Sequence, residues 1–372
     1  MAIRNLIWAL VIAPCCACAA DAGNFRDSEV SAQCTTERDF TVSSDAAGIE
    51  IAGSIMTPRD TPRAAVLMIT GAGPHTREQR ISDTPMYTLI SDHLARRGLV
   101  VARTDARGFG DSTGIADDES YSTADRAVDN RAVLNFLRTQ PEFNHVPFGL
   151  LGHSEGAMIA VMIAADDPDI AFNLLLAPST IPGSEVMGDQ FQTNLLRRGA
   201  TPEAAAAVRE QGIRFAHFLA EGGQRGPEFA AIAHDFLAAH GMPEDQITPD
   251  FAEGLISGYL DSAHYRFFAG YDPTLDLSHL HQPTIAIFAS DDTNIRSDKH
   301  MTAFRAAMDA AGNSDATSVM LPDQDHFFLE HEGVRLDRHI PGEMQVAQEL
   351  FDALDAELVR RGWENEDACE DP

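Results

Sequence analysis

The stretch FGLLGHSEGAMIA, residues 148–160, changes its pattern twice over a short distance. An apolar run typical of a buried strand ends at Gly152, and an apolar run typical of a helix resumes after Gly156. Between these glycines lies Ser154, in a Gly-x-Ser-x-Gly motif that is common by chance but here separates a predicted strand from a predicted helix. The stretch therefore predicts a nucleophile held on a sharp, strained turn. A tight turn that merely contains serine is the alternative.

The sequence around this stretch alternates between strand-like and helix-like patterns. Residues 39–56 contain two segments in which polar and apolar residues alternate, and they predict an antiparallel hairpin. Predominantly apolar runs, separated by segments of helical spacing, lie at residues 64–70, 99–104, 148–152, 172–177, 284–290 and 316–322. Strands buried on both faces that alternate with helices are typical of a mostly parallel sheet flanked by helices, so we expect an α/β fold.

The alternation stops within residues 183–271, which are rich in Ala, Glu and Gln and contain no strand-like run. We expect this segment to form a helical cap inserted after the sixth strand. The α/β core would then consist of a first part, residues 35–182, and a second part, residues 272–365. This organisation predicts one α/β domain that carries a cap, and not two independent domains.

The first residues have the pattern of an export signal. A basic residue, Arg4, precedes an apolar stretch at residues 6–13, and residues 17–19 (Ala-Cys-Ala) provide a cleavage site. The stretch is far shorter than the roughly 20 residues that a membrane-spanning helix needs. We expect a signal peptide over residues 1–19 and a periplasmic or secreted protein. Processing as a lipoprotein, with a lipid anchor, is the alternative, and no other segment is predicted to span a membrane.

The net charge of the chain bears on the kind of partner that it can bind. The formal net charge of −30 argues against nucleic acid as a partner, because phosphate binding needs clustered Lys and Arg.

Cleavage after Ala19 would leave two cysteines, Cys34 and Cys369. In an oxidising compartment these would pair and tie both termini to the body of the protein, and two free thiols on the chain ends are the alternative.

A serine nucleophile needs a base and an acid that orients the base. His326 directly follows the last strand-like run, and Asp291 and Asp292 directly follow the one before it. Because sites in open parallel sheets form beyond the carboxyl ends of the strands, we expect these side chains to meet Ser154 there. On position alone, both aspartates remain candidates for the acid.

Five motifs follow predicted strands at the places where a catalytic site would need them. They are TGAGP at 70–74, DARGFGDSTG at 105–114, GHSEGA at 152–157, ASDD at 289–292 and DQDHFF at 323–328. With these motifs the chain resembles the α/β-hydrolase superfamily over residues 39–362, and it is most similar to a bacterial group of esterase- and peptidase-like serine hydrolases with a GHSEG elbow. The loop that usually begins with His-Gly here begins with Thr-Gly, and the usual Gly-x-x-Asp reads Ala-Ser-Asp-Asp. The alignment makes Asp292 the acid, with Asp291 as the alternative.

The resemblance implies an α/β-hydrolase fold with a helical cap after the sixth strand. It also implies catalytic roles for Ser154, Asp292 and His326, and an oxyanion hole made by the backbone N–H groups of Ala72 and Glu155. A carboxylate in the first turn of a helix favours the helix dipole, and for the Glu155 side chain we expect this role rather than substrate contact.

These expectations describe an exported serine hydrolase that cleaves carboxylic esters through an acyl-enzyme. Its partners would be small-molecule ester or acyl substrates, and it would need neither a metal ion nor a cofactor. A serine peptidase, amidase or thioesterase with the same triad is one alternative, and a non-catalytic binding protein on the same fold is another. We expect His75 at the surface, and the cap residues Phe215, Phe218, Phe267 and Phe268 either at the pocket wall or in the core of the cap.

Overall fold

The computed structural model describes residues 34–46, 48–115, 120–330 and 344–363. The predicted signal peptide, residues 1–19, lies outside these ranges. Cys34 is disulfide-bonded, and Cys369, its expected partner, also lies outside the described residues. No helix in the described ranges has both the length and the apolar character that crossing a bilayer requires.

A sheet of eight strands runs through the centre of the protein in the order β1-β2-β6-β3-β7-β8-β9-β10. The strands are β1 (Thr35–Ser43), β2 (Glu50–Pro58), β3 (Ala64–Ile69), β6 (Leu99–Thr104), β7 (Phe148–His153), β8 (Asn173–Leu176), β9 (Thr284–Ala289) and β10 (Ala316–Leu321). β1 and β2 form the predicted antiparallel hairpin, and β2 also pairs antiparallel with β6. All pairings from β6 to β10 are parallel. The predicted α/β class with a mostly parallel sheet is therefore confirmed.

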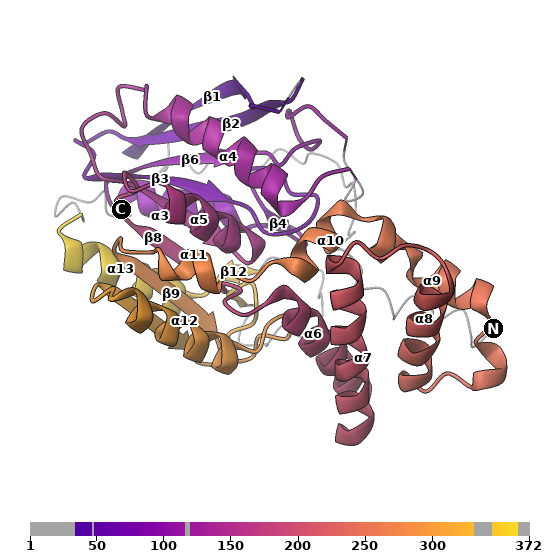
Figure 1. The fold of residues 1–372 in the computed structure, drawn as a ribbon. Coiled ribbons are helices and arrows are strands. Elements are labelled where there is room, and N and C mark those ends of the chain that lie inside the picture. The colour runs from indigo at the N-terminus through magenta and orange to yellow at the C-terminus, as the bar shows by residue number, and fades with distance from the viewer. Residues whose placement is uncertain (1–33, 47, 116–119, 331–343, 364–372) are drawn as a thin grey trace.

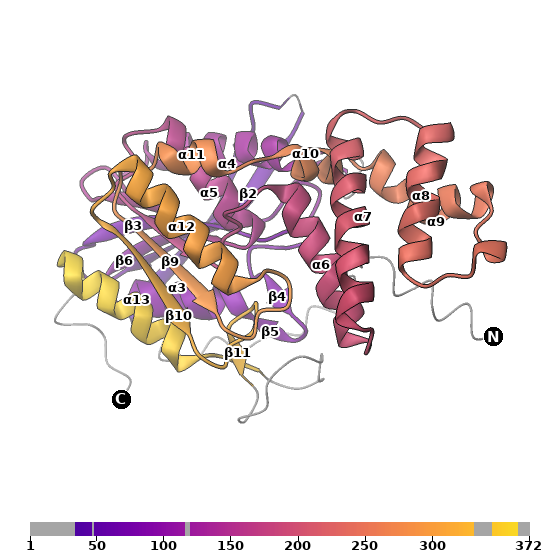
Figure 2. The same cartoon turned by 60° about the horizontal axis from the view of Figure 1, so that its bottom comes forward.

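Helices cover both faces of this sheet (Figures 1 and 2). On one face lie α3 (Met86–Arg96) and α13 (Gln348–Arg361), and on the other lie α4 (Thr123–Leu137), α5 (Glu155–Asp166), α11 (Thr274–Ser278) and α12 (Ser297–Ala311). Two short pairings complete the core: β4 (Arg80–Ile81) with β5 (Thr84–Pro85), and β11 (Leu329–Glu330) with β12 (Gln345–Val346). The last helix, α13, begins only after Gln345 and Val346, because these two residues pair with β11.

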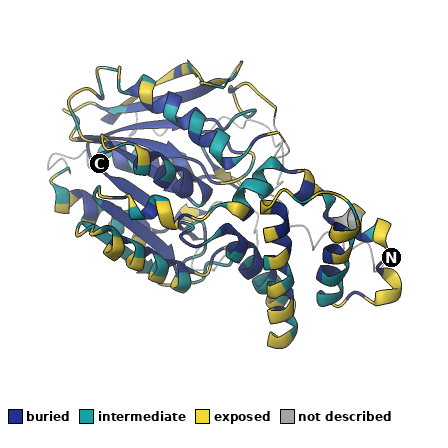
Figure 3. Cartoon of the chain, viewed as in Figure 1, coloured by how far each residue is buried: buried dark blue, intermediate teal, exposed yellow. Residues whose placement is uncertain are grey.

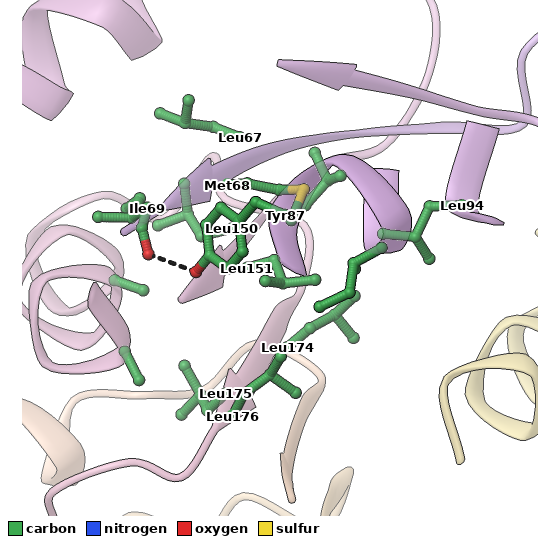
Figure 4. Close-up of a cluster of buried hydrophobic side chains, with 14 of the residues drawn as sticks. Leu67, Met68, Ile69, Tyr87, Leu94, Leu150, Leu151, Leu174, Leu175 and Leu176 are labelled. Atoms are coloured by element: carbon green, nitrogen blue, oxygen red, sulfur yellow. Dashed lines mark hydrogen bonds between the residues drawn. The ribbon is translucent and has the colours of Figure 1, made fainter. Parts of the chain in front are cut away.

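The middle strands are buried along their whole length, as continuous apolar sequence requires. Figure 4 shows the side chains of β3, β7 and β8 packed around Tyr87 of α3. The Tyr87 hydroxyl is fully buried and donates a hydrogen bond of 2.7 Å to the carbonyl oxygen of Ile69, the last residue of β3. This bond fixes the carboxyl end of β3, beside which the candidate site lies.

Between β8, the sixth strand of the large sheet, and β9 the chain forms only helices. Apart from α11, which covers the sheet, they are α6 (Gly183–Arg197), α7 (Pro202–Ala220), α8 (Pro227–Ala239), the short η1 (Glu244–Gln246), α9 (Pro249–Asp261) and α10 (Ala263–Gly270). Together they form a cap that projects from one end of the core, with its outer helix faces exposed (Figures 1 and 3). The cap has its own apolar cluster, which contains Phe215 and Phe218, whereas Phe268 packs against this cluster and against the main core.

Candidate active site

Ser154 lies on the sharp turn between β7 and α5. Its backbone has φ 55° and ψ −118°, a conformation that is strained for any residue other than glycine. The flanking glycines make the turn sterically feasible. A β-carbon on Gly152 would lie 2.2 Å from the carbonyl oxygen of Gly156, and one on Gly156 would lie 2.0 Å from that of Ile69. The motif therefore uses glycine because strand, turn and helix approach one another more closely than any side chain allows.

The predicted base and acid meet Ser154 at the carboxyl edge of the sheet. His326 Nε2 lies 3.0 Å from Ser154 Oγ, and His326 Nδ1 lies 2.7 Å from Asp292 Oδ2. The Asp292 side chain is fully buried, and its other oxygen, Oδ1, accepts hydrogen bonds from the backbone amides of Asn294 and Ile295 at 2.7 and 2.9 Å. Of the two candidate aspartates it is Asp292 whose carboxylate reaches the imidazole.

The loop after β3 lies directly against this turn. A β-carbon on Gly71 would lie 3.6 Å from Ser154 Cβ and 3.2 Å from His153 Nδ1, so only glycine fits without displacing its neighbours. Gly73, with φ 107°, turns the chain away again. Between the two glycines lies Ala72, and Glu155 is the first residue of α5. The structure thus brings the loop that carries the Ala72 amide beside the turn that carries the Glu155 amide.

A buried hydrogen-bonded chain joins this loop to His326. The Gly71 amide donates to Gln79 Oε1 at 2.7 Å, and Gln79 Nε2 donates to His153 Nδ1 at 3.1 Å. His153 Nε2 in turn donates to the His326 carbonyl oxygen at 2.8 Å. This chain requires neutral His153, and burial, together with the neighbouring His326, holds the pKa of His153 well below its ordinary value. His153 thus faces away from the hydroxyl of Ser154, as expected for the residue that precedes a nucleophile.

The Glu155 side chain lies in the first turn of α5, as expected of a dipole-stabilising carboxylate, but it differs from a solvent-exposed one. It is buried, with Arg126 of α4 paired to Oε2, and with Thr123 and the cap residue His264 at Oε1. Burial alone would raise the pKa of the Glu155 carboxyl, but Arg126 and His264 hold this pKa far below its usual range. Glu155 therefore carries a buried charge that connects the elbow, α4 and the cap.

His75 also differs from the expectation, because it is buried rather than exposed. Burial, and secondly the positive charge of Arg126, lowers the pKa of His75 to about 4. Its ring lies beside Gly73, so His75 packs under the loop as a neutral side chain. Elsewhere in the described ranges, no three His, Cys, Asp or Glu side chains are grouped as a metal ion would need.

Arg126 and Gln79 were not among the residues predicted from the sequence. Arg126 does have a signal, because it lies on the buried face of α4 with Asn130, Val133 and Leu137, where an arginine is unexpected unless it has partners. Gln79 follows the loop at a positive φ of 41° and has no comparable signal.

Comparison with known proteins supports the architecture. Residues 60–211 match the family model described as serine aminopeptidase, S33. The chain is 28% identical to Esterase EstD of Thermotoga maritima over 159 residues, which are 42% of this chain and 35% of that protein. It is 30% identical to the monoglyceride lipase of Rattus norvegicus over 130 residues, 34% of this chain and 39% of that protein. The matches thus span little more than a third of these relatives.

The fold is similar over a longer range. An esterase from Pyrococcus furiosus superposes with a TM-score of 0.54 at 13% identity, covering 91% of this chain and 95% of that one. Identity this low shows a shared fold and no more.

Proposed function

We propose that the chain is an α/β-hydrolase, and specifically a serine hydrolase that cleaves carboxylic esters through an acyl-enzyme. The match to the serine aminopeptidase family model over residues 60–211 and the shared fold support this proposal. The observation that carries this proposal is the continuous hydrogen-bonded series from Ser154 Oγ through His326 to Asp292. From the N-terminal sequence pattern we also propose that the protein is exported to the periplasm or secreted.

In the first half of the reaction, Ser154 Oγ attacks the ester carbonyl carbon while its proton moves to His326 Nε2. Asp292, held as an acceptor by two backbone amides, keeps Nδ1–H of the imidazole pointing toward itself and stabilises the imidazolium that forms. The negative charge that develops on the carbonyl oxygen would be met by the amides of Ala72 and Glu155. His326 then returns the proton to the leaving alcohol as the C–O bond breaks.

In the second half, water attacks the acyl-enzyme. His326 removes a proton from this water and later delivers it to Ser154 Oγ, which leaves as the acid product departs. The same imidazole acts as base and acid in both halves, so its fixed position between Ser154 and Asp292 is needed throughout.

The contacts of the Glu155 carboxylate favour an ester as the substrate over a peptide with a free amino terminus. An aminopeptidase needs an anionic group that receives the substrate ammonium, and Glu155 is the carboxylate next to the nucleophile in sequence. Both of its oxygens are already bound, to Arg126 at one and to Thr123 and His264 at the other. The esterase and lipase names of the relatives in the comparison support the same choice.

A substrate panel tests the proposal. The purified protein should hydrolyse nitrophenyl esters, and the variant Ser154→Ala should lose this activity, while aminoacyl nitroanilides should react slowly or not at all. Faster cleavage of the anilides would identify a peptidase. Hydrolysis of neither class by a correctly folded protein would favour a binding protein on the same fold.

A further inference from the structure

Arg126 extends from α4 into the space beneath the elbow. Its side chain is buried, with 5% of the residue exposed. Its two terminal nitrogens contact the loop after β3, and one of them also contacts the first residue of α5. Nη2 donates to the Thr70 carbonyl oxygen at 2.8 Å and to Thr70 Oγ1 at 2.9 Å, and Nη1 donates to the Gly71 carbonyl oxygen at 3.0 Å and to Glu155. One guanidinium therefore contacts both segments that carry the amides assigned to the oxyanion hole.

These contacts fix the orientation of two consecutive peptide groups. A peptide is planar, so its carbonyl oxygen and its N–H point in opposite directions. The Thr70–Gly71 peptide is held at both ends, by Arg126 on its oxygen and by Gln79 on its N–H. The next peptide, Gly71–Ala72, is held by Arg126 at its oxygen. Its opposite end, the Ala72 N–H, is thereby directed away from Arg126.

From this geometry we infer that Arg126 is a positioning residue that sets the oxyanion hole, by locking the Gly71–Ala72 peptide and holding Glu155 at the start of α5. The inference rests on the proposed function, because it concerns the same site. The loop Thr70-Gly71-Ala72-Gly73 consists of small residues that could otherwise adopt several backbone conformations. A rigid hole needs its donors oriented before the reaction starts, and here a buried side chain supplies the orientation.

An arginine is required for this task. The planar guanidinium reaches two carbonyl oxygens, a hydroxyl and a carboxylate at once, whereas the lysine ammonium offers three donors at one point. The paired Glu155 carboxylate compensates the buried positive charge, which limits the cost of burying the guanidinium.

The test is Arg126→Lys, with Arg103→Lys as the matched control. Arg103 is also buried, at 3% exposed, and binds Glu37 and Thr88 away from the elbow. For each protein one measures kcat and KM for a nitrophenyl ester and the inhibition constant of an alkyl trifluoromethyl ketone, whose adduct with serine carries an oxyanion. Arg126→Lys should lower kcat about 10- to 100-fold with little change in KM, and it should raise the inhibition constant of the ketone by a similar factor. Arg103→Lys should leave kcat and the inhibition constant of the ketone unchanged.

The ratio of KM to the ketone inhibition constant does not depend on how much of the protein is folded, so instability alone cannot lower it. Where Arg126→Lys does not fold, Glu155→Gln gives a second test, since it keeps the backbone N–H but removes the charge that anchors Arg126; the ratio should fall by a smaller factor. An unchanged ratio in the folded variant, beside an active wild type, overturns the inference and leaves the proposed function intact. A wild type that neither hydrolyses esters nor binds the ketone overturns both.

Discussion

Replacing Gly156 by alanine should destabilise the protein, whereas the same replacement at Gly254 should stabilise it. Both glycines lie in helices, in α5 and α9 respectively. The added methyl group at Gly156 would lie 2.0 Å from the Ile69 carbonyl oxygen, and no flexible side chain is present there to move aside. At Gly254, which is exposed, no heavy atom lies within 4 Å of the added carbon.

The magnitudes follow from these surroundings. Ile69 cannot withdraw freely, because its carbonyl oxygen is the acceptor for the buried Tyr87 hydroxyl. Relief of the overlap must therefore separate α5 from β3, and we expect a loss of about 3 kcal/mol in the free energy of unfolding, the upper end of typical overpacking costs. Alanine in place of an exposed glycine inside a helix should add about 1 kcal/mol.

Urea unfolding followed by far-UV circular dichroism measures both effects. Gly156→Ala should also lower kcat for an ester, because moving α5 separates the Glu155 amide from the Ala72 loop. A Gly156→Ala protein that is as stable and as active as the wild type would refute the account of the elbow. So would destabilisation of equal size at Gly156 and Gly254.

Two further predictions concern the catalytic acid Asp292 and the buried side chain of His300. Asp292→Asn should reduce kcat by about 10⁴-fold, while Asp291→Asn should retain most of it in the same ester assay; the opposite ranking would move the acid by one residue. Burial lowers the pKa of His300 to about 4 from an ordinary 6.5, so the unfolded chain binds this proton more tightly. His300 should therefore contribute a fall of up to about 3 kcal/mol in the free energy of unfolding as the pH drops from 6.5 to 4. His300→Gln should make that fall shallower in urea titrations at several pH values, and an unchanged slope would contradict the burial argument.

Much of the fold could be predicted from the sequence because its signals are local. Continuous apolar runs identify strands buried on both faces, and parallel strands bring their carboxyl ends to one edge of the sheet. Residues that directly follow those strands, such as Asp292 and His326, are therefore placed near Ser154 by topology alone. The glycines around Ser154 likewise reflect a local steric need, which the close approaches at Gly152 and Gly156 make explicit.

The polar network beneath the site was not predictable in the same way. Arg126, Glu155 and His264 come from α4, α5 and α10, and no spacing in the sequence indicates that their side chains meet. In sequence, Glu155 matches a solvated residue in a first helical turn. Its buried state depends on partners contributed by distant elements, and the same is true of His75 under the loop.

The most direct test of the central claim is covalent labelling with a fluorophosphonate, followed by mass spectrometry of the digested protein. Labelling should place one adduct on Ser154, and it should be abolished by Ser154→Ala and strongly slowed by His326→Ala, because the imidazole activates the hydroxyl. Equal labelling of Ser154→Ala and wild type, or an adduct found only on another residue, would contradict the account.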